Sequence, residues 1–143
     1  MMTIAPNAFV VKETVRFRHC DPAGIVFYPR YVEMINDFIE QWFAQGLNAS
    51  FHHLHVDRKL GTPTASLQVE FITPSRWEDV LTQTLVVERI GGASVAVAIA
   101  FNGADGAPRI KANVTLVIVD LNTFRSTRIP DELREAMGRF ISS

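Results

Sequence analysis

One acidic side chain stands where a predicted strand gives way to a predicted helix. Asp21 ends a segment rich in Val and Phe and comes seven residues before Tyr28, where the helical pattern begins. The first N–H groups of a helix lack intrahelical partners and carry positive partial charge, so they can hold a carbonyl oxygen that becomes negative. A carboxylate on the other side of that carbonyl could attack it or activate a water molecule. This combination predicts acyl transfer.

The same residues also fit a plain turn. Asp21-Pro22-Ala23-Gly24 places Pro at the second position and Gly at the fourth, as a type I turn prefers, and the Asp side chain can close it. For these four residues taken alone, a purely structural turn is the simpler interpretation. The chemical interpretation therefore depends on the elements that surround the turn.

A long apolar helix is predicted directly after the turn, over residues 29–45. Apolar side chains recur there with the spacing of one helix face. Pro29 suits the first helical turn, and Gly46 suits the position just after the last one. The helix should lie deep in the core, with an apolar stripe of Tyr31, Met34, Ile35, Phe38, Ile39, Trp42 and Phe43.

The rest of the chain is mostly strand in pattern, with a short closing helix. Short turns favour antiparallel neighbours, and one antiparallel sheet must cover the apolar helix. We therefore predict an α+β hotdog fold: a five-stranded antiparallel sheet wrapped around a long central helix, with a short C-terminal helix, as one domain of residues 1–143. Edge strands of such a sheet are often covered by a second copy of the chain. The predicted strands are residues 8–18, 62–72, 80–90, 94–101 and 109–121, and the closing helix is residues 130–140.

Composition excludes several classes of function. The 143 residues include 14 Lys and Arg against 15 Asp and Glu, so no basic surface for nucleic acid is expected. A single cysteine rules out an internal disulfide framework and a cysteine-rich zinc site. The apolar run 93–101 is far shorter than the roughly 20 residues that span a bilayer. With no secretion signal in pattern, a cytoplasmic protein without membrane contact is expected.

The segment HCDPAGIVFYPRY, residues 19–31, resembles the signature of the 4-hydroxybenzoyl-CoA thioesterase family of hotdog enzymes. Gly61-Thr62-Pro63, followed by the acidic stretch that begins at Glu78, matches the family at the expected distance. The similarity extends over residues 15–121, which is most of the chain.

The resemblance implies a role for each matching residue. Asp21 falls on the catalytic carboxylate, which acts as nucleophile or as general base. The backbone N–H of Tyr28 falls on the donor that polarises the thioester carbonyl, and Thr62 falls on a residue that reaches the acyl site from a neighbouring subunit. The family needs no metal and no separate cofactor, since coenzyme A is part of the substrate. Its active sites lie between subunits of homodimers or homotetramers.

Three positions depart from the family pattern. His19 stands where the relative with the most similar motif has an acid. It could tune the charge of Asp21, but we favour its interpretation as a polar residue at the end of the strand. Asn36 replaces an acid that faces the substrate hydroxyl, although an amide can still bind a phenol. A basic turn that binds the coenzyme A phosphates is absent, and only Ser94 and Arg89 remain there. The acyl pocket is expected near Phe27, Asn36 and Phe51.

Two further features are weighed against simpler interpretations. His52, His53 and His55 fit no established zinc spacing, so we expect a loop or short helix near the acyl pocket rather than a metal site. Cys20 lies beside an acid, which should raise its pKa and make a nucleophilic thiolate unfavourable.

The sequence therefore predicts a thioester hydrolase acting on an aromatic or medium-sized acyl-CoA, with free acid and coenzyme A as products. Two alternatives stay open. The absent basic turn is compatible with a thioesterase that acts on acyl carrier protein. A hotdog domain that binds acyl-CoA without hydrolysing it would keep the pocket but would need no carboxylate at Asp21.

Overall fold

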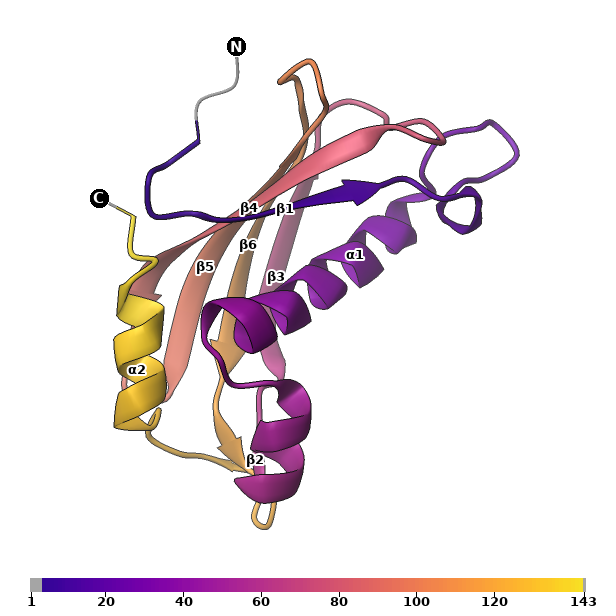
Figure 1. Cartoon of the computed structure of the whole chain (residues 1–143). Coiled ribbons are helices and arrows are strands. Elements are labelled where there is room, and N and C mark those ends of the chain that lie inside the picture. Colours follow the sequence, from indigo (N-terminus) through magenta and orange to yellow (C-terminus); the bar gives the residue numbers. More distant parts are fainter. Residues whose placement is uncertain (1–3, 143) are drawn as a thin grey trace.

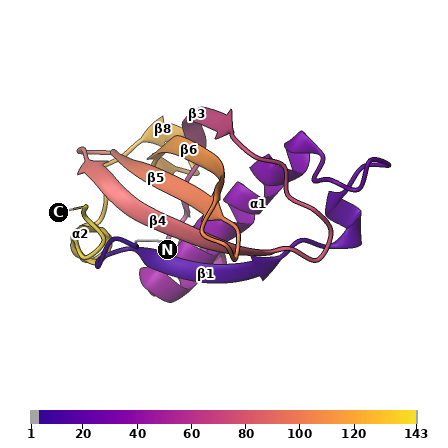
Figure 2. The same ribbon diagram turned by 90° about the horizontal axis from the view of Figure 1, so that it is seen from above.

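The apolar stripe predicted from the sequence forms one side of a long helix, which the main sheet wraps. The structure is a computed structural model that describes residues 4–142. Helix α1 (Tyr28–Gln41) crosses the concave face of the sheet, as the views along and across it show (Figures 1 and 2). All seven residues of the predicted stripe are buried: Tyr31, Met34, Ile35, Phe38, Ile39, Trp42 and Phe43.

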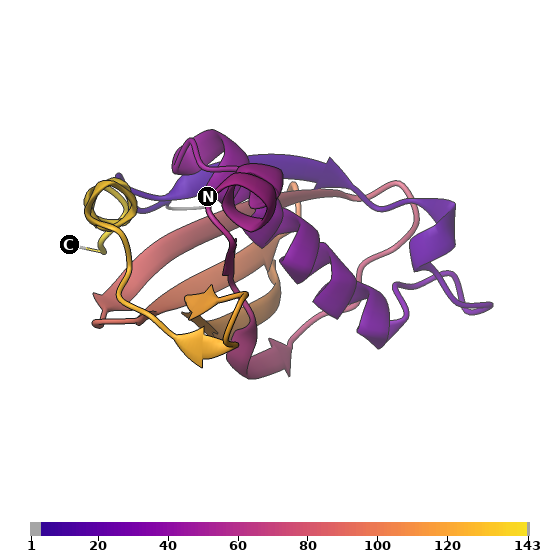
Figure 3. The ribbon, with the colours of Figure 1, turned by 90° about the horizontal axis from the view of Figure 1, so that it is seen from below.

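The main sheet has five strands, all antiparallel, in the order β1-β4-β5-β6-β3. A small second sheet has the order β2-β7-β8. Figure 3 shows α2 beside the end of the main sheet, with the small sheet near it. The elements are β1 (Phe9–Thr14), β2 (Leu60–Gly61), β3 (Thr64–Phe71), β4 (Val80–Ile90), β5 (Ser94–Asn102), β6 (Pro108–Val117), β7 (Val119–Asp120), β8 (Arg125–Ser126) and α2 (Asp131–Gly138).

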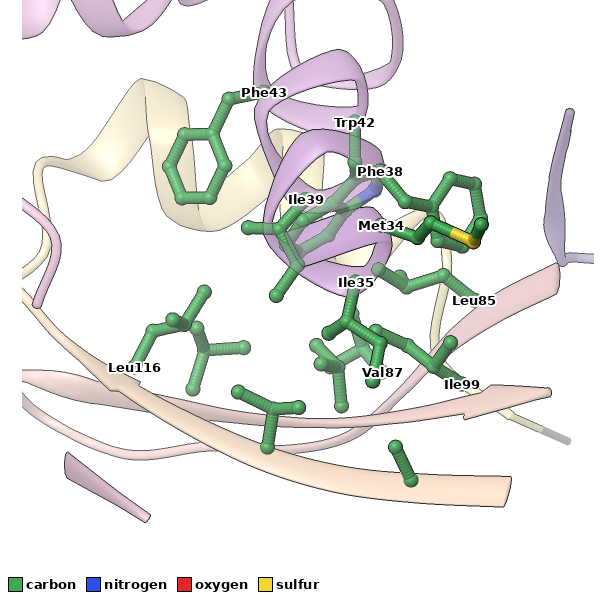
Figure 4. Close-up of a cluster of buried hydrophobic side chains, with 14 of the residues drawn as sticks. Met34, Ile35, Phe38, Ile39, Trp42, Phe43, Leu85, Val87, Ile99 and Leu116 are labelled. Atoms are coloured by element: carbon green, nitrogen blue, oxygen red, sulfur yellow. The ribbon is translucent and has the colours of Figure 1, made fainter. Parts of the chain in front are cut away.

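The core forms between α1 and the inner face of the sheet. Figure 4 shows Ile35 and Ile39 of α1 directed at side chains of the strands, among them Val87 and Ile99. Phe38 has no exposed surface, and its ring stacks on Phe9 at 5.6 Å. Each large apolar side chain buried in this way stabilises the fold by roughly 1.5–3 kcal/mol. This packing holds α1 in a fixed position over the sheet and thereby fixes where the helix begins.

The predicted hotdog architecture is confirmed, but one strand pairing was predicted wrongly. Because residues 72–79 form a short connection, β3 was expected beside β4. Instead β3 pairs with β6, and β4 lies between β1 and β5. The connection runs from β3 at one edge of the sheet past β6 and β5 to β4, since both sides of β4 are already paired. This leaves β3 as an edge strand with most of its residues exposed.

Some predicted boundaries also shift. The strand 8–18 ends at Thr14, and residues Phe17–His19 form a 3-10 turn, η1. The predicted helix 29–45 is α1 followed by a wider π-type turn, η2 (Trp42–Gly46). The turn ends at Gly46, whose backbone lies so close to the ring of Trp42 that a side chain there would clash with it. A second such turn, η3 (His53–Asp57), precedes β2.

Two more differences concern the later strands. The strand 62–72 starts at Thr64, so Thr62 lies between β2 and β3. The strand 109–121 divides into β6 and β7. Prediction and structure agree for β4, whose bounds are those expected from the sequence. No helix within residues 4–142 combines the length and the apolar character needed to cross a membrane.

Candidate active site

Asp21 lies at the tip of a short hairpin that leads into α1. Its N–H donates to the carbonyl of Ile25 at 3.0 Å, and the N–H of Phe27 donates to the carbonyl of His19 at 2.9 Å. The two arms are therefore held in register from the end of η1 to the residue before the helix. The predicted turn is the tip of this hairpin.

The turn itself is closed by the Asp21 side chain, as the sequence predicted. The N–H of Gly24 donates to the Asp21 carbonyl at 2.9 Å, and the N–H of Ala23 donates to Oδ1 of the carboxylate at 2.8 Å. Gly24 has a φ of +80°, a conformation that suits glycine. The second carboxylate oxygen, Oδ2, has no partner within residues 4–142, so one oxygen fixes the side chain and the other is available.

The start of α1 offers a free donor. The backbone N–H of Tyr28 has no acceptor in the described part of the chain, as expected for the first residue of a helix. The side chains of Tyr28 and Phe27 are both exposed and touch edge to face at 5.5 Å. Tyr28 also meets Phe71 of β3 at 6.0 Å. The helix start is therefore open, next to the sheet edge.

Within one chain, the acid and this donor lie at different points of the hairpin. Asp21 pairs with Ile25, and Tyr28 comes three residues further along. Three extended residues span about 10 Å. The carboxylate and the free N–H therefore belong to separate backbone positions of one hairpin.

The loop between β3 and β4 forms backbone contacts with the hairpin that carries Asp21. The N–H of Val26 donates to the carbonyl of Ser75 at 2.9 Å, and Ile25 pairs with Arg76 in an isolated antiparallel bridge. Ser75 has no exposed surface. These contacts fix the ribbon that carries Asp21 to a buried part of the fold.

A cavity of about 690 Å³ lies between α1, η1 and the edge strand β3. Asn36, which the sequence assigned to the acyl pocket, lines this cavity. Thr64 lines it too, two residues after the predicted Thr62. The apolar part of the wall comes from α1, β3 and β6, and the charged part comes from Arg18, Arg30, Glu33 and Asp37.

His19 lines the same cavity and was not expected there. It is only 8% exposed, and its Nδ1 accepts a hydrogen bond of 2.8 Å from the N–H of Arg16. Burial, with the positive charge of Arg18 close by, holds the pKa of His19 below its ordinary value. The interpretation of His19 as a polar strand-end residue is wrong, because the 3-10 turn after β1 brings its ring inward. The turn depends on the three-residue spacing from Arg16 to His19, which allows this hydrogen bond.

Other predicted site residues do not line this cavity. Phe51 is half-buried and packs against Phe43 at a ring distance of 5.2 Å, near η3. Thr62 lies between β2 and the edge strand β3, outside the cavity wall. Phe27 belongs to the exposed helix start.

Arg89 and Ser94 lie at the far end of β4 from the hairpin. β4 begins at Val80, close to the Asp21 hairpin, and ends at Ile90, so its length separates the two regions by roughly 30 Å. There, the N–H of Gly91 donates to the carbonyl of Ser94 at 2.7 Å. Within one chain the structure does not bring these two residues to the Asp21 carboxylate.

The histidine cluster and the cysteine are accounted for by local contacts. Nδ1 of His53 lies 2.9 Å from Oδ2 of Asp57, and Nδ1 of His55 lies 2.6 Å from the carbonyl oxygen of Phe51. In the part of the chain that the structure describes, no three His, Cys, Asp or Glu side chains are arranged to hold a metal ion. Burial and the neighbouring Asp21 raise the pKa of the Cys20 thiol.

Comparison with known proteins supports this interpretation. Residues 15–137 match the thioesterase-like superfamily. A curated 4-hydroxybenzoyl-CoA thioesterase from Pseudomonas sp. (strain CBS-3) is 29% identical over 77 residues, which cover 53% of this chain and 55% of that enzyme. The match thus spans about half the length of the curated relative.

Solved structures agree with the fold. A thioesterase superfamily protein from Jannaschia sp. CCS1 superposes with a TM-score of 0.88 and 25% identity, covering 100% of both chains. A 1,4-dihydroxy-2-naphthoyl-CoA thioesterase from Synechocystis superposes with a TM-score of 0.84 at 17% identity, covering 92% of this chain and 96% of the other. From the match over residues 15–137, together with the hotdog architecture, the chain belongs to the thioesterase-like superfamily.

Proposed function

We propose that the protein hydrolyses an acyl-CoA thioester to the free acid and coenzyme A. The observation that carries this proposal is the hairpin of Asp21, which presents a carboxylate with one unoccupied oxygen and leads directly into a helix whose first N–H is free. A carboxylate and a backbone donor are the two groups that thioester hydrolysis without a metal needs.

In this mechanism the N–H of Tyr28 donates to the thioester oxygen while negative charge develops on it. Asp21 either removes a proton from water, which attacks the carbonyl carbon, or attacks that carbon itself to give an anhydride that water then cleaves. In both routes the carbon–sulfur bond breaks and coenzyme A leaves as the thiolate. Removing one oxyanion donor typically costs roughly 3–4 kcal/mol in barrier, so a single backbone N–H can be decisive.

The active site is proposed to form between two copies of the chain, in a homodimer or homotetramer. The separation of Asp21 from Tyr28 along the hairpin favours a donor from the neighbouring copy. The edge strand β3 also exposes Leu67 and Phe71, which a second copy would cover. In such an assembly Thr62 would reach the acyl site of its neighbour.

The acyl group is proposed to be aromatic or of medium size. A cavity of about 690 Å³ lies within the usual range of ligand sites and accommodates a ring and its substituents. The Pseudomonas and Synechocystis relatives are named for aromatic acyl-CoA substrates, which favours the same class here. Asn36 supplies a hydrogen-bonding group to the cavity wall.

Binding of coenzyme A is assigned to Arg89 and Ser94 of one copy, since phosphates favour arginine and hydroxyl donors. No nucleic acid, membrane, metal or separate cofactor is expected in the reaction, and a cytoplasmic location stays a prediction.

Hydrolysis of a panel of acyl-CoA thioesters, followed by detection of the free thiol, tests the proposal. The panel contains benzoyl, hydroxybenzoyl, phenylacetyl and short aliphatic esters. We expect turnover of at least one aromatic ester and its loss in Asp21→Asn. The hydrolysis rate of the same acyl group attached to acyl carrier protein is measured for comparison. Faster hydrolysis of that thioester would show that acyl carrier protein, and not coenzyme A, carries the substrate. Binding of every ester without turnover would contradict the proposal.

A further inference from the structure

Two polar side chains, His19 and Gln83, are buried beside two adjoining cavities. A smaller cavity of about 170 Å³ shares Arg18, His19, Met34 and Asp37 with the large one, so His19 stands where the two meet. The smaller cavity is also lined by Gln83, which is only 2% exposed.

We propose that His19 and Gln83 form a polar end to the acyl site and select acyl groups that carry an oxygen substituent at their far end. The inference rests on the proposed thioesterase function and adds two residues that determine specificity. In this assignment the ring of the acyl group fills the large cavity, and its oxygen reaches the smaller one.

The position of Gln83 in β4 is the first support. Side chains alternate along a strand, so Leu81, Gln83, Leu85 and Val87 all face α1. Gln83 is the polar member of this row, and its side-chain amide has no hydrogen-bond partner within residues 4–142. A buried amide without a partner reduces stability, so its presence in an apolar row favours a role in binding.

The hydrogen bonding of His19 is the second support. Because Nδ1 accepts from the N–H of Arg16, the neutral ring carries its proton on Nε2. Nε2 has no hydrogen-bond partner in the described chain, and the atom is not fully buried. It is therefore open to the cavity as a donor, held in place by a bond on the other side of the ring.

The charges around His19 favour an uncharged partner. The charged groups that act on His19 are three positive ones, Arg16, Arg18 and Arg30, and one negative one, Glu13. The carboxylate of Asp37 lies in the wall of both cavities. Arg30 is already paired with Glu33 at 2.7 Å. A hydroxyl fits this environment, since it can accept from Nε2–H of His19 and donate to the amide oxygen of Gln83.

The test compares esters that differ by one hydroxyl group: benzoyl-CoA against 3-hydroxybenzoyl-CoA and 4-hydroxybenzoyl-CoA. We expect the natural protein to favour one hydroxylated ester in kcat/KM. Gln83→Leu, which keeps the size of the side chain, should reduce this preference about tenfold, because kcat/KM should fall more for the hydroxylated ester than for benzoyl-CoA. Its melting temperature should not fall, because an unpartnered buried amide is replaced by an apolar group.

Two substitutions at His19 form a matched pair. In His19→Asn the amide oxygen can still accept from Arg16, but the side chain is too short to provide the Nε2 donor. In His19→Gln a donor is kept near the place of Nε2. We expect His19→Asn to lose the preference for the hydroxylated ester about tenfold, and His19→Gln to keep part of it.

Equal losses on benzoyl and hydroxybenzoyl esters in Gln83→Leu and His19→Asn would overturn the inference, as would a natural protein that shows no preference. Calorimetric binding of benzoate, 3-hydroxybenzoate and 4-hydroxybenzoate separates this outcome from a failure of the proposed function. If no ester is hydrolysed but a hydroxybenzoate binds better than benzoate and the variants abolish the difference, the selective site stands and the thioesterase mechanism fails. Equal binding of all three acids would overturn the selective site.

Discussion

The hydroxyl of Tyr31 donates a hydrogen bond of 2.7 Å to the hydroxyl of Ser75, joining α1 to the loop between β3 and β4. Both residues are buried, and burial raises the pKa of the Tyr31 hydroxyl, so the group stays protonated as a donor. The carbonyl of Ser75 also accepts from Val26 of the Asp21 hairpin. One residue of the loop thus holds both the helix and the hairpin that precedes it.

Removing this contact should destabilise the fold and disturb the site together. Tyr31→Phe leaves the Ser75 hydroxyl buried without its donor and is expected to lower the free energy of unfolding by about 1–2 kcal/mol. Ser75→Ala should act similarly, and the double variant should cost less than the sum of the two. Urea unfolding of the three variants measures this. Strictly additive losses would show that the two hydroxyls do not stabilise each other.

Asp21 can be tested by two substitutions that separate chemistry from structure. In Asp21→Asn the side-chain oxygen still accepts from the N–H of Ala23, so the turn should persist while the rate falls about 100-fold or more. Asp21→Ala also removes the acceptor and should additionally cost about 1 kcal/mol of stability. Steady-state hydrolysis and thermal unfolding measure the two effects. A fully active Asp21→Asn would exclude the assigned role.

His19 should make stability depend on pH. Its pKa in the folded state lies below the ordinary 6.5, so the unfolded chain takes up the proton at higher pH than the folded one does. The stabilising contribution is therefore fully present above pH 6.5 and is lost as the pH falls towards the folded-state pKa. Denaturant unfolding should show a steeper loss below pH 6.5 for the natural protein than for His19→Asn. Parallel curves would show that His19 titrates as it does in the unfolded chain.

The core under α1 should respond strongly to truncation. Phe38 has no exposed surface and contacts the rings of Phe9 and Phe101. Phe38→Ala is expected to lower the free energy of unfolding by about 3–5 kcal/mol. Phe124, whose side chain is 79% exposed, provides the matched control, and its replacement by Ala should change stability by less than about 0.5 kcal/mol. Similar losses at both positions would contradict the described packing.

The edge strand β3 provides a test of assembly. Leu67 is partly exposed on this strand, and a charged side chain there opposes burial against a second copy. We expect the natural protein to have the mass of a dimer or tetramer in light scattering, and Leu67→Glu to shift it towards the monomer. A monomeric natural protein with full activity would contradict the proposed site between two copies.

Local pattern alone determined much of this protein. The helix stripe from Tyr31 to Phe43, the bounds of β4 and the closed turn at Asp21 all follow from spacing and from residue preferences over a few positions. Each of these depends on neighbours in the chain, and so the sequence carries the full signal. The family motif around Asp21 was visible for the same reason.

Tertiary structure decided what depends on distant pairings. β3 lies beside β6 because both sides of β4 and one side of β6 pair with other strands. No short stretch of sequence encodes this pairing. The same holds for His19 and Gln83, which the pattern presents as ordinary polar residues. A turn brings one inward, and the register of β4 under α1 buries the other. Arg89 and Ser94 were assigned from a motif, but the length of β4 places them far from the hairpin, since separation in space follows from the strand's direction and not from its composition.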